Sequence, residues 1–167
     1  MPRTLRLALL ALSLSLPLPG LAAPPDLVLK DLAGKPHNVN EYIGQGKWTI
    51  VMLWAHDCPV CNAEVHQMTF FHDDHRKKDA AVLGISIDGW ALRDKAQAFV
   101  DRHSVNFPNL IAEPEPKLIE TLSARTFYGT PTFYFYKPDG TFVKQHVGAL
   151  NQEQAERILA QLKKGGA

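Results

Sequence analysis

One junction constrains the fold more than any other part of this sequence: a long apolar run that ends just before a pair of cysteines. Trp48–Trp54 (WTIVMLW) is continuously apolar and rich in β-forming residues, which is typical of a central strand covered on both faces. Cys58 and Cys61, the two cysteines of the chain, follow at once. Cys61, Val65 and Met68 then recur at i, i+4 and i+7. The sequence therefore predicts a buried strand that leads directly into a helix with both thiols at its start.

The rest of the pattern alternates between strands and helices. A hairpin is expected within 24–39, around the turn Ala33–Pro36, and a second hairpin around Lys137–Gly140. Further strands are expected at 81–87, 107–111, 132–136 and 141–147, and helices around 92–100, 118–122 and 151–164. This order indicates an α/β fold, a mixed central sheet with helices on both faces.

Composition narrows the class of protein. The 167 residues fit one domain, and 46% hydrophobic with 21% charged residues are globular values. The formal charge is +1 and no Lys/Arg run stands out, so we expect no nucleic-acid partner. Two cysteines are too few for a disulfide-scaffold miniprotein or a four-thiolate zinc site.

The first 23 residues have the pattern of a signal peptide. Arg3 and Arg6 precede the apolar run Leu7–Leu16, and small residues, Ala22 and Ala23, suit cleavage. The run is about half the roughly 20 residues that a membrane-spanning helix needs, although an uncleaved anchor stays an alternative. We therefore expect a signal peptide at 1–23, a folded domain at 24–167, and a periplasmic or otherwise extracytoplasmic location where disulfides persist.

The cysteine spacing predicts redox chemistry. If Pro59 opens the helix, Cys58 is its N-cap, and its sulfur faces the free N–H groups of the first turn. Those donors and the helix dipole stabilise a thiolate, so Cys58 is expected to be the exposed nucleophile. Cys61 lies one turn deeper and is expected to resolve the mixed disulfide. A static disulfide is the alternative, but a loop this small constrains the unfolded chain little.

A metal site is the other chemical interpretation of the same segment. His56, Cys58 and Cys61 are soft ligands that copper(I) would accept, and further histidines follow at His66, His72 and His75. These three lie one or more turns along the helix, so some of them must face away from the thiols. We expect no metal and no cofactor.

The motifs resemble the thioredoxin superfamily. The pattern Trp54-Ala55-x-x-Cys58-x-x-Cys61 follows an apolar strand, and Gly129-Thr130-Pro131-Thr132 precedes a hairpin. Further residues point to the exported TlpA/ResA/CcmG-like branch: Glu64, the strand 82–88, Pro138–Gly140 and His146–Gly148.

This resemblance implies a thioredoxin fold with an N-terminal β-hairpin extension and a strand-helix insertion. It implies a cis Thr130–Pro131 bond opposite the thiols, with Thr130 and Pro131 binding the substrate strand. It also implies a monomeric protein-disulfide reductase without a cofactor. The partners would be exported protein thiols or disulfides, for example in cytochrome c-type biogenesis, and a membrane electron donor of thiol–disulfide type.

Five residues around the thiols are expected to modulate them: Trp54, His56, Asp57, Pro59 and Glu64. Asp57 stands where most relatives carry an aromatic residue, and its charge should raise the pKa of Cys58. His56 could offset that charge if protonated. Met52 replaces a buried Asp of thioredoxins, and Glu64 is either its substitute or a solvated carboxylate. A moderate thiol pKa predicts a reductant rather than an oxidant.

Two other function classes remain open at this point. A peroxiredoxin-type thiol peroxidase shares the extended thioredoxin fold, but Ala55 stands where that chemistry usually needs Thr. A copper(I) delivery module usually has its cysteines one residue further apart, with a distal His.

Overall fold

The computed structural model describes residues 23–165 except Ala124. The predicted signal peptide therefore lies outside the described residues, apart from Ala23. The elements in chain order are β1 (Val28–Asp31), β2 (Pro36–Asn38), η1 (Val39–Glu41), β3 (Trp48–Trp54), α1 (Pro59–His75), β4 (Ala80–Ser86), η2 (Trp90–Leu92), α2 (Arg93–Arg102), β5 (Asn109–Ile111), α3 (Pro116–Leu122), β6 (Thr132–Tyr136), β7 (Phe142–Val147) and α4 (Gln152–Gly165).

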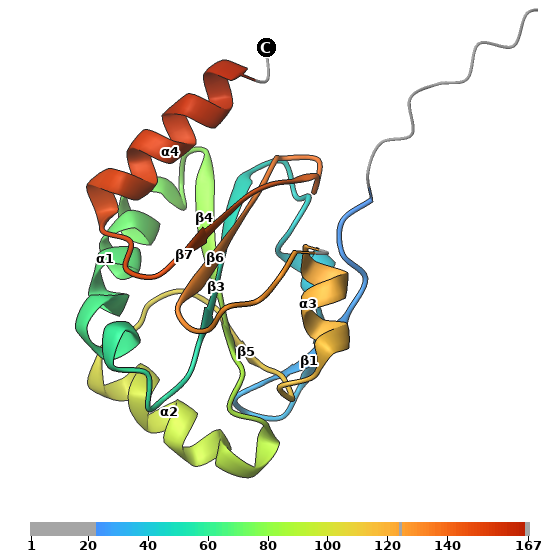
Figure 1. Ribbon diagram of the computed structural model, residues 1–167, viewed down its shortest axis with the longest axis vertical. Coiled ribbons are helices and arrows are strands. Elements are labelled where there is room, and N and C mark those ends of the chain that lie inside the picture. Colours follow the sequence, from blue (N-terminus) through green and yellow to red (C-terminus); the bar gives the residue numbers. More distant parts are fainter. Residues whose placement is uncertain (1–22, 124, 166–167) are drawn as a thin grey trace, which may run out of the picture.

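The strands form one mixed sheet in the order β2-β1-β5-β4-β3-β6-β7 (Figure 1). The strand β3 lies between a parallel neighbour, β4, and an antiparallel one, β6. All seven of its residues are buried, as the continuous apolar run predicts. The N-terminal hairpin β1–β2 joins the sheet because β1 pairs antiparallel with β5.

Helices cover both faces of this sheet. One face packs on α1, α2 and α4, and its core contains both cysteines together with β3 residues such as Met52 and Trp54. The other face packs on α3 and η1, through residues such as Leu118 and Val39. Figure 1 shows α1 and α4 on one side of the sheet and α3 on the other. The predicted α/β fold class is confirmed.

Most predicted elements lie within one or two residues of the observed bounds. The segment between β4 and α3 contains α2 and then β5, so the expected insertion runs helix first and strand second. The helix expected around 92–100 does not include Leu92, which lies in η2 and is 36% exposed. The reason is local: the α-helix begins only at Arg93, so Ala96 and Phe99 carry the buried face.

Among residues 23–123 and 125–165, no helix combines the length and the apolar character that crossing a bilayer requires.

Candidate active site

The two cysteines lie where β3 turns into α1. Cys58 is the N-cap of α1, Pro59 is its first residue, and the N–H of Cys61 donates to Cys58 Sγ at 3.1 Å. The two sulfur atoms are joined as a disulfide. The first turn of α1 thus directs a backbone N–H at the Cys58 sulfur. The same N–H and the helix dipole would stabilise the thiolate after reduction.

Access to solvent distinguishes the two sulfur-bearing residues. Cys58 is 6% exposed and Cys61 is 0% exposed. Cys58 is therefore less exposed than the sequence predicts, because its sulfur turns inward toward the first helical turn and its disulfide partner. The asymmetry nevertheless has the expected sense, because only Cys58 of the two keeps any exposed surface.

Trp54 forms the buried floor beneath this turn. Its indole stacks on Phe99 of α2, with ring centroids 4.3 Å apart and an interplanar angle of 21°. Its indole N–H donates to Asn109 Oδ1 at 3.0 Å. The contacts tie the last residue of β3 to α2 and β5, so the inserted elements support the strand that leads to Cys58.

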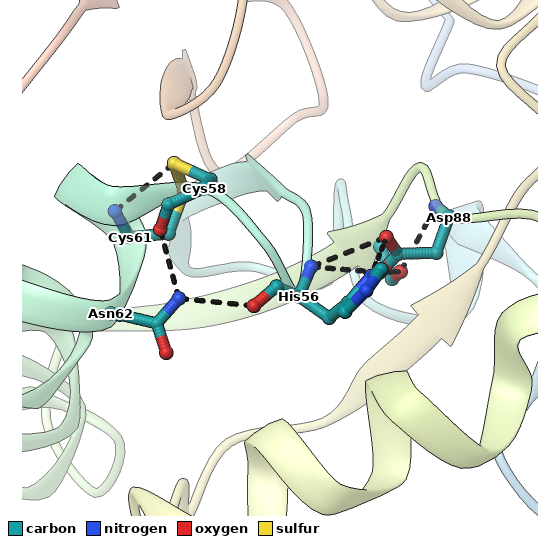
Figure 2. A network of polar contacts seen from close by, with 6 residues as sticks. His56, Cys58, Cys61, Asn62 and Asp88 are labelled. Carbon is teal, nitrogen blue, oxygen red and sulfur yellow. Dashed lines mark hydrogen bonds and ion pairs between the residues drawn. A yellow bond between two sulfur atoms is a disulfide. The ribbon is translucent and has the colours of Figure 1, made fainter.

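His56 is held by Asp88, which follows β4. Its backbone N–H donates to both carboxylate oxygens, at 3.0 and 3.2 Å, and its Nδ1 lies 2.6 Å from Oδ1 (Figure 2). The Asp88 side chain is 3% exposed. The hydroxyl of Ser86 donates to Oδ2 at 2.6 Å, and the backbone N–H of Asp88 donates to the same hydroxyl. Ser86 thus fixes the orientation of the carboxylate that binds His56.

Asn62 holds the turn from the helix side. Its Nδ2 donates to the carbonyls of His56 and Cys58, at 3.0 and 2.9 Å (Figure 2). Its Oδ1 lies 3.0 Å from His103 Nε2, at the end of α2. Burial, Arg102 and His66 lower the pKa of His103. Because the amide nitrogen donates twice, its oxygen must accept, so His103 Nε2 carries a hydrogen.

Asp57 and Glu64 occupy different surroundings. Asp57 is exposed, and its carboxylate lies within 4.8 Å of the ligand atoms of His56 and Asp88. These three groups contain donors that a cation could use, but His56 Nδ1 is already hydrogen-bonded to Asp88. Glu64 is half-buried on α1, and among the described residues its carboxylate makes no hydrogen bond. The sequence-based alternatives for Glu64 therefore stay open.

The three helix histidines of the copper hypothesis do not gather at the thiols. His66 is exposed and contacts Gln67 and Phe70. His72 is buried, and its Nδ1 accepts the N–H of Val82. His75 Nδ1 pairs with Asp79 at 2.9 Å. Each imidazole therefore has a local partner away from the disulfide.

Thr130 and Pro131 lie at the edge of the sheet where β3 ends. Their peptide bond is cis, as the resemblance implies. Thr132 pairs with Leu53, which places Pro131 level with the end of β3. The carbonyl of Pro131 accepts the N–H of Gly148, so the loops before β6 and after β7 meet there.

The same end of the sheet carries exposed apolar side chains. Tyr128 is 76% exposed, Val147 44% and Val60 39%. A groove of about 400 Å³ is lined by α3, Phe127 and Ile87, which pack on the face of the sheet opposite to the cysteines. Ile87 donates its N–H to the carbonyl of Trp54, so the groove adjoins the strand that leads to the cysteines.

Comparison with known families decides the assignment. The model of the AhpC/TSA family matches residues 19–145, which is most of the chain. The chain belongs to the AhpC/TSA family. This places it in the thioredoxin superfamily, as the motifs of the two cysteines and Gly129–Thr132 predict.

Its relatives in this superfamily are thiol–disulfide enzymes. The chain is 27% identical to the thiol-disulfide oxidoreductase ResA of Oceanobacillus iheyensis, over 82% of this chain and 69% of that one. It is 27% identical to the thiol:disulfide interchange protein DsbE of Vibrio cholerae, over 83% and 70%. A secreted disulfide oxidoreductase of Mycobacterium tuberculosis has 25% identity and a TM-score of 0.64, covering 81% of this chain and 96% of that one. The predicted enzyme class is confirmed.

Sequence reasoning missed the residues that hold the turn: Asp88, Ser86, Asn62 and His103. A signal for Asp88 was present in the sequence, because this residue directly follows the strand predicted at 81–87. The carboxyl ends of parallel neighbours meet at one edge of a sheet, so a carboxylate after β4 lies near the residues after β3. The bond from His103 to Asn62 spans 41 residues and had no such signal.

Proposed function

We propose that this protein is an extracytoplasmic thiol–disulfide reductase that acts on exported proteins. The observation that carries the proposal is the Cys58–Cys61 pair itself: an N-cap sulfur that accepts a helix N–H, joined to a fully buried partner one turn deeper. This arrangement supplies a stabilised attacking thiolate and a resolving thiol that outside molecules cannot reach.

The proposed reaction is two successive thiol–disulfide exchanges. The reduced Cys58 thiolate attacks one sulfur of a substrate disulfide, forms a mixed disulfide and releases the other substrate sulfur as a thiolate. Cys61, after losing its proton, attacks Cys58 Sγ, which forms the Cys58–Cys61 disulfide and releases the second substrate thiolate. Two electrons pass to the substrate, and an external dithiol donor must return them.

The surroundings of the disulfide support a polypeptide substrate. Thr130 and Pro131 lie at the end of β3, where an extended chain could lie beside them in strand-like fashion. Tyr128 and Val147 offer exposed apolar contacts on the flanking loops.

The cellular context is the finer part of this proposal. An export signal at residues 1–23 would place the protein outside the cytoplasm, where one solved relative is described as secreted. We propose exported protein thiols, as in cytochrome c-type biogenesis, as the substrate class. The relatives named ResA and DsbE support this choice. A membrane dithiol donor would then keep the protein reduced.

Turnover on a generic disulfide tests the activity. We expect the purified protein with a dithiol donor to accelerate insulin disulfide reduction, and Cys58→Ser to abolish this acceleration. Peroxide consumption that also depends on Cys58, without insulin reduction, would instead support a thiol peroxidase. Retention of one copper(I) per chain on desalting, without either activity, would support a copper carrier.

A further inference from the structure

The turn between β3 and α1 is held more tightly than a surface loop needs to be. Its backbone groups are bound from two directions: Asp88 accepts the N–H of His56, and Asn62 donates to the carbonyls of His56 and Cys58. The N–H of Cys58 donates to the carbonyl of Ala55. The hydrogen bond from the N–H of Cys61 to the Cys58 sulfur thus depends on where this turn lies.

We propose that Asp88 is a positioning residue for the thiol chemistry: it fixes the turn at His56 so that the Cys58 sulfur faces the first N–H groups of α1. This inference rests on the proposed function, because it concerns how the reactive sulfur of that site is held in position.

Geometry favours this role over a purely structural one. Asp88 makes three contacts with one residue, His56, which lies two positions before Cys58. Its side chain is 3% exposed, and Ser86 orients it, so the anchor is rigid and belongs to the core strand β4. Charge-assisted bonds of this kind are about twice as strong as neutral ones.

The charge of Asp88 and its hold on the turn have opposite effects on the pKa of Cys58, so the proposal can be tested. A carboxylate near a thiolate raises the pKa of the thiol, so deleting the carboxylate should lower that pKa. A turn that loses its anchor should present the sulfur less well to the helix N–H groups, which raises the pKa. Asp57 provides the matched control, because it is a neighbouring carboxylate that holds no group of the turn by any hydrogen bond among the described residues.

The measurement is the pH dependence of Cys58 alkylation by iodoacetamide in the full chain. A Cys61→Ser background leaves Cys58 as the single thiol and keeps the backbone N–H of residue 61. We expect Asp57→Ala to lower the pKa of Cys58, and Asp88→Ala to place it at least about 0.5 above the Asp57→Ala value. Equal or lower values in Asp88→Ala would overturn the proposal, since Asp88 would then act only through its charge.

A second variant covers the case in which Asp88→Ala does not fold. Ser86→Ala removes the hydroxyl that orients the carboxylate and removes no charge. The proposal predicts a higher Cys58 pKa in this variant, and an unchanged pKa would contradict it. Both readouts are properties of the thiol, so they can fail while insulin reduction succeeds, and the reverse.

Discussion

At the residue scale, the two cysteines differ in solvent access and in the partners of their sulfur atoms. Cys58 is at the helix N-terminus and keeps some exposed surface, whereas Cys61 is fully buried in the core beside Val65 and Met68. A reagent that attacks thiols therefore meets one of them first, and the division of labour follows from geometry.

The first prediction concerns that division of labour. Cys61→Ser should retain an attacking thiol but lose the resolving one, so mixed disulfides with substrate proteins accumulate. Non-reducing gels followed by mass spectrometry should show Cys58 as the linked residue. Stoichiometric iodoacetamide on the reduced wild-type protein should modify Cys58, and preferential modification of Cys61 would reverse the assigned roles.

The surroundings of His72 give a second residue-scale prediction, on pH and stability. Its Nδ1 accepts the N–H of Val82, so the folded protein needs this nitrogen unprotonated. Burial, followed by Arg76 and Lys47, lowers the pKa of His72 from 6.5, while Asp73 opposes this. The unfolded chain therefore binds the proton at higher pH than the folded chain does. The stability contributed is full above about pH 6.5 and is lost as pH falls toward the lowered value.

A variant can isolate this effect. His72→Asn should keep an acceptor near the position of Nδ1 while removing the titration. Denaturant unfolding at several pH values should then show a flatter decline of stability below pH 6.5 than in the wild type. His146→Gln is the matched control: the His146 imidazole donates to the carbonyl of Ala149, a hydrogen bond that protonation does not break, so the decline should stay unchanged. His103, the pKa of which is also lowered, keeps its own contribution in both variants.

At the scale of elements, strand β4 must pass close beneath a hydrogen bond that joins its neighbours. A Cβ on Gly84 would lie 2.0 Å from Asn109 Oδ1 and 3.0 Å from Trp54 Nε1. Glycine is therefore required where the Trp54–Asn109 bond crosses the strand.

The third prediction follows from this close approach. Gly84→Ala should displace the Asn109 side chain, break its bond to the Trp54 indole, and cost about 2–3 kcal/mol of unfolding free energy. Denaturant unfolding measures the loss. Gly165→Ala, where an added Cβ meets nothing within 4 Å, is the control and should change stability by less than about 0.5 kcal/mol. A Gly84→Ala variant as stable as the control would show that the crossing is adaptable.

Local pattern predicts these elements well, and side-chain networks poorly. The apolar run 48–54 and the proline after Cys58 mark the strand, the helix start and the N-cap, because each depends on nearby residues. The contacts Asp88–His56 and His103–Asn62 depend on how distant segments meet in space. The burial of Cys58 likewise depends on packing that no local pattern reports.

At the scale of the whole molecule, the fold brings the redox pair and the Thr130–Pro131 loop to one end of a seven-stranded sheet. The sequence pattern predicts a mixed sheet, but it does not predict that β1 pairs with β5, because this pairing requires the inserted strand to lie beside the N-terminal hairpin. The resemblance implies the hairpin extension itself.

The direction of electron flow belongs to this scale because the whole environment of the disulfide sets it. Oxidants of this superfamily have an unusually stable thiolate in the reduced state. Here the helix terminus favours the thiolate, but Asp57, which precedes Cys58 in the chain, and Asp88, which is bound to His56, add two carboxylates at this turn. The residues between the cysteines, Pro59 and Val60, bring no positive charge. We therefore expect a moderate pKa for the Cys58 thiol and a reducing cysteine pair.

Equilibration with glutathione measures whether Cys58 and Cys61 form a reducing dithiol. The protein is incubated in glutathione redox buffers of known ratio, and the fraction with the Cys58–Cys61 disulfide is measured after acid quenching and thiol labelling. A reducing pair should have a reduction potential near the roughly −270 mV of thioredoxin. A value near the roughly −120 mV of a strong periplasmic oxidant would contradict this expectation.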